Sequence, residues 1–217
     1  MNPDLNEWNL VVVGQWNPHI FSPQWMCNTL LNVPQVESEF VIGPLGGGMR
    51  YLTDHLAILP GQDRLIIGMR DTLDATLEEA EHITLRALDL LRHTPIRAAG
   101  VNFLYTEEVL PESVLRTFQL ADNDVLADAG YEVSSTEIVR DIRVGDAVLK
   151  LKMVHSDQQP AKFYFNFHHV IDSPARADTI LRGQTVGYRD RALRLLRDFY
   201  HLTVDNEGNN VVNNPNH

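Results

Sequence analysis

Residues 163–172 read Phe-Tyr-Phe-Asn-Phe-His-His-Val-Ile-Asp, and this alternation is typical of a β-strand. Successive side chains of a strand point to opposite faces of its sheet. One face is apolar apart from a single histidine, as expected of a hydrophobic core: Phe163, Phe165, Phe167, His169 and Ile171. The other face is mixed: Tyr164, Asn166, His168 and Val170. We therefore expect His169 to be buried with a hydrogen-bond partner.

The two adjacent histidines point in opposite directions on such a strand. They cannot both reach one metal ion by ordinary strand geometry, which argues against a paired-histidine zinc site. No Gly-x-Ser-x-Gly, His-x-x-x-His or His-Glu-x-x-His spacing occurs in the chain. We predict no metal site, no cofactor and no catalytic residue.

The preceding strand, at about residues 147–155, carries lysines on alternate positions. A hairpin turn within residues 157–160 would place them on the same face as Tyr164. That face is either a solvated sheet surface or a surface that binds a partner. On the second interpretation the partner-binding residues are Lys150, Lys152, Tyr164, Asn166 and His168.

A second recognition spot is predicted in the loop at residues 16–21, through Trp16 and His19. The alternative is that Trp16 and Phe21 pack the start of the next helix onto the sheet. Ser22 and Pro23 are typical of a helix start.

Hydrophobic periodicity predicts the same order of elements twice, a strand, a helix, three strands and a long helix. In the first half, strands are expected at residues 9–16, 39–43, 51–59 and 64–70, and helices from Phe21–Trp25 onward and at 72–92. In the second half, strands are expected at 96–105, 132–144, 147–155 and 162–171, and helices at 111–121, 122–129 and 173–200. The glycine-rich residues 44–50 are expected to be a flexible connection.

The predicted fold class is therefore α+β, a duplicated unit that forms an antiparallel sheet with the long helices on one face. Its parts are residues 1–94, residues 95–204 and a mobile tail at 205–217. The order of elements resembles the saddle of TATA-binding proteins, in topology alone and without a shared motif. DNA binding, which that resemblance implies, is opposed by a net charge of −11.

Composition points to an intracellular globular protein. Hydrophobic residues make up 44% and charged residues 22%, and the one cysteine cannot form an internal disulfide. Neither a secretory signal nor a membrane span is predicted, so the expected location is the cytoplasm.

The leading hypothesis is a non-enzymatic binding or assembly protein that uses an exposed sheet face, as a homo-oligomer or a subunit of a larger complex. Its partner would be a protein or a second copy of the chain. One alternative is nucleic-acid binding through the same face, which the local lysines favour and the overall acidity opposes. A second alternative is an enzyme with a divergent site around His168 or His169.

Overall fold

The computed structural model describes residues 1–43, 46–171 and 173–204. The chain has a mixed α+β fold built on one large antiparallel sheet, as predicted. The strands are β1 (Asn2–Pro3), β2 (Asn9–Gly14), β3 (Glu37–Gly43), β4 (Gly46–Leu52), β5 (Leu56–Pro60), β6 (Arg64–Met69), β7 (Ile96–Glu107), β8 (Ser135–Val144), β9 (Ala147–Ser156) and β10 (Gln159–Val170). Their order across the sheet is β3-β4-β5-β6-β2-β7-β10-β9-β8, and β1 pairs with β7 outside this path. Strands β3 and β8 thus form the two edges.

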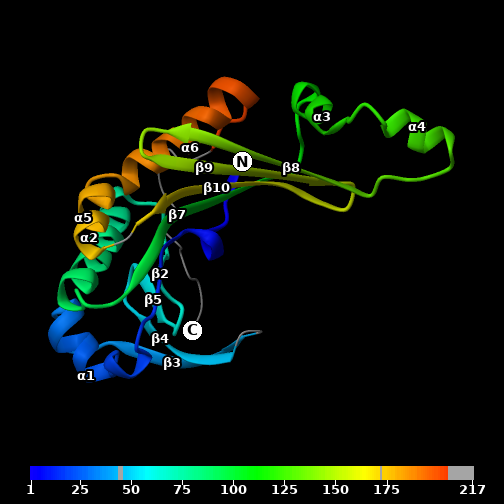
Figure 1. The fold of residues 1–217 in the computed structure, drawn as a ribbon. Helices are drawn as coiled ribbons and strands as arrows, with labels where there is room; N and C mark the ends of the chain where they lie inside the picture. Colours follow the sequence, from blue (N-terminus) through cyan, green and yellow to red (C-terminus); the bar gives the residue numbers. More distant parts are fainter. Residues whose placement is uncertain (44–45, 172, 205–217) are drawn as a thin grey trace.

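Three helices pack on one face of the curved sheet (Figure 1): α2 (Asp74–Leu90), α5 (Pro174–Leu181) and α6 (Thr185–Tyr200). Short helices follow β2 at one end of the sheet: η2 (Pro18–Ile20), α1 (Pro23–Trp25) and η3 (Met26–Leu31). Two more, α3 (Glu112–Phe118) and α4 (Asn123–Asp128), connect β7 to β8, and η1 (Leu5–Glu7) precedes β2. We call the sheet face opposite α2, α5 and α6 the open face.

The core lies between the sheet and these helices. Leu10 and Val12 of β2 are fully buried, and so is Trp8, which directly precedes this strand. The Trp8 indole N–H donates to the carbonyl of Leu104 at 3.0 Å, and its ring meets that of Phe103 edge-on at 5.0 Å between centroids. Because β2 and β7 are central strands, this aromatic cluster joins the two halves of the sheet.

The helix start at Ser22 is confirmed. The Ser22 hydroxyl accepts from the backbone N–H of Trp25 at 3.3 Å, and Pro23 occupies the first helical position. This is the arrangement that caps the unsatisfied N–H groups of a first turn.

Two elements that were predicted to be continuous are each divided in the structure. The strand predicted at 51–59 is two strands separated by a turn. In this turn the Thr53 backbone N–H donates to the Leu56 carbonyl, and the Leu56 backbone N–H donates to the Thr53 hydroxyl oxygen. The helix predicted at 173–200 is broken into α5 and α6 at Gly183, whose φ of +71° lies in the left-handed region that favours glycine.

Strand β1 was not predicted, and β4 begins within the glycine-rich stretch that was expected to be only a connection. The expected tail at 205–217 lies outside the described residues. In the described part of the chain, no helix is long and apolar enough to cross a membrane.

Candidate partner-binding face

The two faces of β10 are divided as the alternation predicted. Phe163, Phe165 and Phe167 are at most 1% exposed, and His169 is 2% exposed. Tyr164, Asn166 and His168 are half-buried side chains of the open face. The hydrogen-bond partner expected for His169 is present, since its Nε2 lies 2.8 Å from the Tyr188 hydroxyl oxygen.

The predicted hairpin of β9 and β10 sets the lysines beside these residues. Lys150 is directly opposite Asn166, and Lys152 is opposite Tyr164. The Lys152 ammonium lies 4.6 Å from the centre of the Tyr164 ring, a cation–π contact, and 3.5 Å from a carboxylate oxygen of Glu137 on β8. The structure therefore brings all five predicted residues of this group onto one surface.

A row of amide side chains crosses the middle of the open face. Asn166 donates through Nδ2 to Oδ1 of Asn102, and Asn102 donates through Nδ2 to Oδ1 of Asn9 at 2.8 Å. The three residues are directly opposite one another on β10, β7 and β2. The Asn166 side chain passes over Gly100, where an added Cβ would lie 3.1 Å from its amide nitrogen. We call Asn9, Asn102 and Asn166 the amide row.

Charged side chains extend the amide row toward β8. Lys150 is opposite Asn166, and Asp141 is opposite Lys150. Burial lowers the pKa of His168, the positive charge of Lys150 lowers it further, and Asp141 opposes the change. His168 is therefore neutral near pH 7 and can offer both a donor and an acceptor.

One atom of the amide row is unsatisfied. Asn166 Oδ1 is buried and has no hydrogen-bond partner within the described residues. A buried carbonyl oxygen without a donor costs free energy, so such atoms in native proteins call for an explanation.

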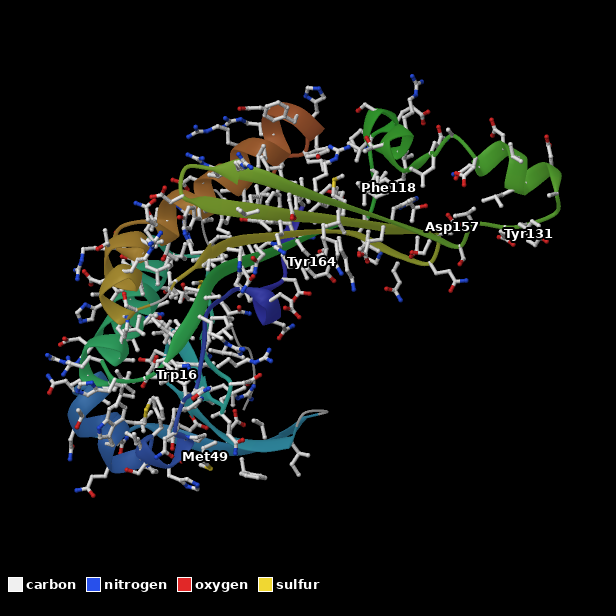
Figure 2. All side chains as sticks on the ribbon, in the orientation of Figure 1. Trp16, Met49, Phe118, Tyr131, Asp157 and Tyr164 are labelled. Carbon is white, nitrogen blue, oxygen red and sulfur yellow. The ribbon has the colours of Figure 1, made fainter. Side chains whose placement is uncertain are left out.

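The second predicted spot lies elsewhere. Trp16 is only 5% exposed, its indole N–H donates to the carbonyl of Val12 at 3.1 Å, and its ring contacts Phe21. This agrees with the packing alternative weighed for Trp16. His19 is exposed in η2, where Asn17 accepts from its backbone N–H. Figure 2 shows Trp16 well apart from Tyr164. The structure does not bring Trp16 and His19 together with the lysines.

The sequence indicated Asn166 but not Asn9 and Asn102, because the members of the amide row are far apart along the chain. Asn9 and Asn102 stand on strands whose relative register no local pattern reveals. The available signal was that Asn102 interrupts the apolar residues of a predicted strand and that Asn9 begins one.

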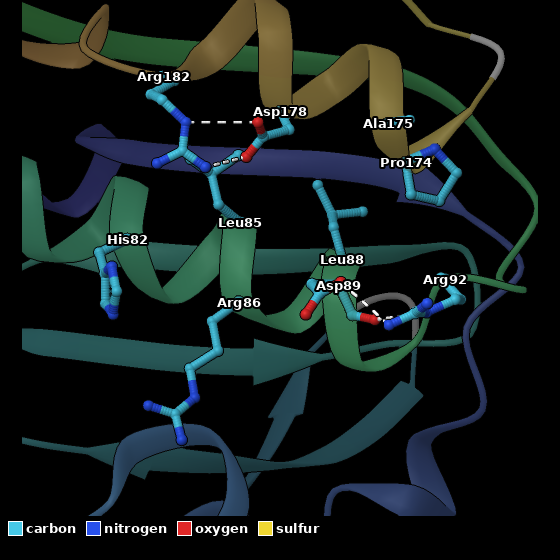
Figure 3. Close-up of a pocket in the computed structure, with 10 residues that line it drawn as sticks. All are labelled: His82, Leu85, Arg86, Leu88, Asp89, Arg92, Pro174, Ala175, Asp178 and Arg182. Atoms are coloured by element: carbon cyan, nitrogen blue, oxygen red, sulfur yellow. Dashed lines mark hydrogen bonds and ion pairs between the residues drawn. The ribbon is translucent and has the colours of Figure 1, made fainter.

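A larger groove of about 670 Å³ lies between α2 and α5 (Figure 3). Asp89 pairs with Arg92 at 3.3 Å, and Asp178 pairs with Arg182 one turn away. These charges are thus satisfied along their own helices, and we assign the groove no function. Within residues 1–43, 46–171 and 173–204, no cluster of three or more His, Cys, Asp or Glu side chains could hold a metal ion.

Comparison with known proteins matched the chain to no family model and to no curated protein. The candidate function therefore rests on the geometry of the open face.

Proposed function

We propose that the chain is a non-enzymatic binding or assembly protein that holds a protein partner against the open face of β9, β10, β7 and β2. The observation that carries the proposal is the amide row with its unsatisfied Asn166 oxygen. Polar side chains at the centre of an antiparallel sheet are usually either fully solvated or fully paired. Because this oxygen is buried, a partner that completes the row by donating to it would first have to turn the Asn166 side chain outward.

The charges of this face suit a protein rather than a polyanion. Lys152 is close to Glu137, and Lys150 is opposite Asp141, so positive and negative groups alternate across β8 and β9. Mixed charges give specificity toward a partner with a complementary pattern. With the net charge of −11, they weaken the attraction for a phosphate backbone.

Nucleic-acid binding through the same face is the second candidate. The contact of Lys152 with Tyr164 favours it, because an aromatic ring beside a cation can stack on a base and contact a phosphate. An electrophoretic shift assay with single- and double-stranded DNA at low salt separates the two functions. Binding at low salt would support the second candidate, and its absence would reject it.

The proposal is tested with a variant carrying Lys150→Ala, Lys152→Ala, Tyr164→Ala and His168→Ala. Its control carries Arg176→Ala and Arg194→Ala, which change exposed residues of α5 and α6 behind the sheet. Sedimentation velocity measures self-association, and affinity purification from the native host measures partner capture. We expect the first variant to lose self-association, partner capture or both, while its unfolding transition is unchanged. The control variant should retain both properties. If the first variant retains both, the proposal is wrong.

We also propose that the fold is an internal duplication of residues 1–94 and 95–204. The support is the strand order, in which the first long strands of the two halves, β2 and β7, are central neighbours. In the first half the last strand, β6, pairs with β2, and β5 lies next to β6. In the second half the last strand, β10, pairs with β7, and β9 lies next to β10. A duplicated sheet of this kind would present one continuous surface to a partner. We propose that the protein acts in the cytoplasm as an oligomer or a subunit of a complex.

A further inference from the structure

A small pocket of about 230 Å³ lies on the helix side of the sheet, near the end of β10. It is lined by the turn between β8 and β9 and by helices α5 and α6. Its polar lining residues are Asp146, His169, Thr179, Gln184, Tyr188 and Arg191. Because His168 and His169 point to opposite faces, this pocket is separate from the open face.

His169 lines this pocket and has one unsatisfied ring nitrogen. The side chain is buried, and its Nε2 is engaged by the Tyr188 hydroxyl at 2.8 Å. Its Nδ1 is also buried and has no hydrogen-bond partner among the residues that the structure describes. The Tyr188 ring is stacked on Phe167, with 4.4 Å between centroids, so the hydroxyl that orients the imidazole is itself held in place.

In one of its two neutral tautomers, His169 carries its ring proton on Nδ1, which is then a donor. Burial lowers the pKa of His169, and His168 lowers it further, while Asp146 opposes the change, so the imidazole is neutral near pH 7. Burial raises the pKa of Tyr188, so its hydroxyl keeps its proton and can donate to Nε2. In that arrangement the ring proton is on Nδ1.

Arg191 supplies a positive charge to the same pocket. It follows Tyr188 by three residues on α6, a spacing that places both side chains on the same side of a helix. Arg189 pairs with Asp74 and Asp190, and Arg197 pairs with Asp198, whereas Arg191 takes part in no ion pair in the described part of the chain.

We propose that this pocket binds a small molecule that carries one carboxylate, whose oxygens accept hydrogen bonds from His169 Nδ1 and from the Arg191 guanidinium. Both groups are donors, and a carboxylate offers the two acceptor oxygens that a guanidinium binds best. The volume excludes a drug-sized ligand. Asp146 lines the pocket and repels an anion more strongly the greater its negative charge, which disfavours phosphate and dicarboxylates relative to a single carboxylate.

The test uses sodium butyrate as the probe, with sodium chloride at equal ionic strength as the blank and inorganic phosphate as the competing anion. The imidazole nitrogen resonances of His169 are followed by NMR during titration. We expect a saturable shift with butyrate, with the Nδ1 proton retained. No saturable shift, or tighter binding of phosphate than of butyrate, would overturn the proposal.

Two variants locate the binding. Arg191→Gln removes the charge from an exposed position and should weaken butyrate binding by about tenfold or more, the usual cost of losing a charged hydrogen bond. Arg194→Gln changes an exposed arginine of the same helix outside the pocket and should bind like the natural protein. Equal weakening by both variants, or by neither, would contradict the proposed site.

Discussion

Glu81 of α2 accepts two hydrogen bonds from Thr185 at the start of α6. Its Oε2 lies 3.1 Å from the Thr185 backbone nitrogen and 2.9 Å from the hydroxyl oxygen. The same carboxylate accepts from the backbone N–H of Gln184 at 3.0 Å and from that of Gly183. A side chain of one helix thus satisfies the free N–H groups at the start of another, where negative charge is also favoured by the helix dipole.

We expect Glu81→Ala to lower the free energy of unfolding by about 1.5–3 kcal/mol, because a charged, buried acceptor of several hydrogen bonds is lost. Denaturant unfolding followed by circular dichroism measures the change. Glu78→Ala removes an exposed carboxylate from the same helix and should change stability by no more than about 0.5 kcal/mol. If the two variants lost similar amounts of stability, the hydrogen bonds of Glu81 to the start of α6 would not contribute to the free energy of unfolding.

Gly183 and Gly187 should respond in opposite ways to the same substitution. Gly183→Ala forces a side chain into a backbone with φ of +71°, at a cost of about 1–2 kcal/mol. Gly187 lies within α6, and a Cβ there meets nothing within 4 Å, so Gly187→Ala should raise stability by about 0.5–1 kcal/mol. Thermal unfolding of both variants measures the sign of each change in stability. A stabilising effect of Gly183→Ala would contradict the need for glycine between α5 and α6.

The amide row should show pairwise coupling. In a double-mutant cycle with Asn9→Ala and Asn102→Ala, we expect a coupling energy of about 0.5–1.5 kcal/mol, since the two side chains share a hydrogen bond of 2.8 Å. A cycle of Asn9→Ala with Arg194→Ala, which lie on opposite sides of the sheet, should be additive. Additivity in both cycles would mean that the Asn9–Asn102 bond adds nothing to stability.

Three histidines should titrate on different sides of the ordinary value of 6.5. The hydrogen bond with Asp71 raises the pKa of His55, whereas burial lowers the pKa of His168 and of His169. NMR titration of the ring resonances measures the three midpoints. Asp71→Asn should lower the His55 midpoint and leave that of His169 unchanged. A His169 midpoint above 6.5 would contradict its burial as a neutral ring.

The same shifts fix the direction of the stability change with pH. The unfolded chain binds protons more readily than folded His168 and His169, so these two groups destabilise the fold as the pH falls below about 6.5. His55 acts in the opposite direction, since its stabilisation is present at low pH and is lost as the pH rises through its folded pKa. His169→Phe should therefore reduce the loss of stability in acid.

The sequence predicts the structure correctly where a short periodic pattern of residues determines it. The alternation in β10 predicts which of His168 and His169 is buried, and Ser22 with Pro23 predicts a helix start. The sequence does not predict contacts between residues that only the tertiary fold brings together. Glu81 meets Thr185 only because α2 packs beside α6, and Asn9 meets Asn102 only because β2 pairs with β7 in one register.

The break at Gly183 illustrates a third case. Glycine within an apolar helical period is compatible with a continuous helix at a modest cost, as at Gly187. The capping contact from Glu81, which lies far away in the sequence, stabilises the new helix start at Thr185. The local sequence therefore does not distinguish these two glycines.

The two edges of the sheet differ in their tendency to recruit strands from other molecules. Strand β8 carries Glu137, Asp141 and Arg143, and an added strand would have to desolvate these charges. Strand β3 leaves Phe40 65% exposed and Ile42 84% exposed. In concentrated solution, aggregation by strand addition is therefore expected to begin at β3, while the charges on β8 protect the opposite end of the molecule.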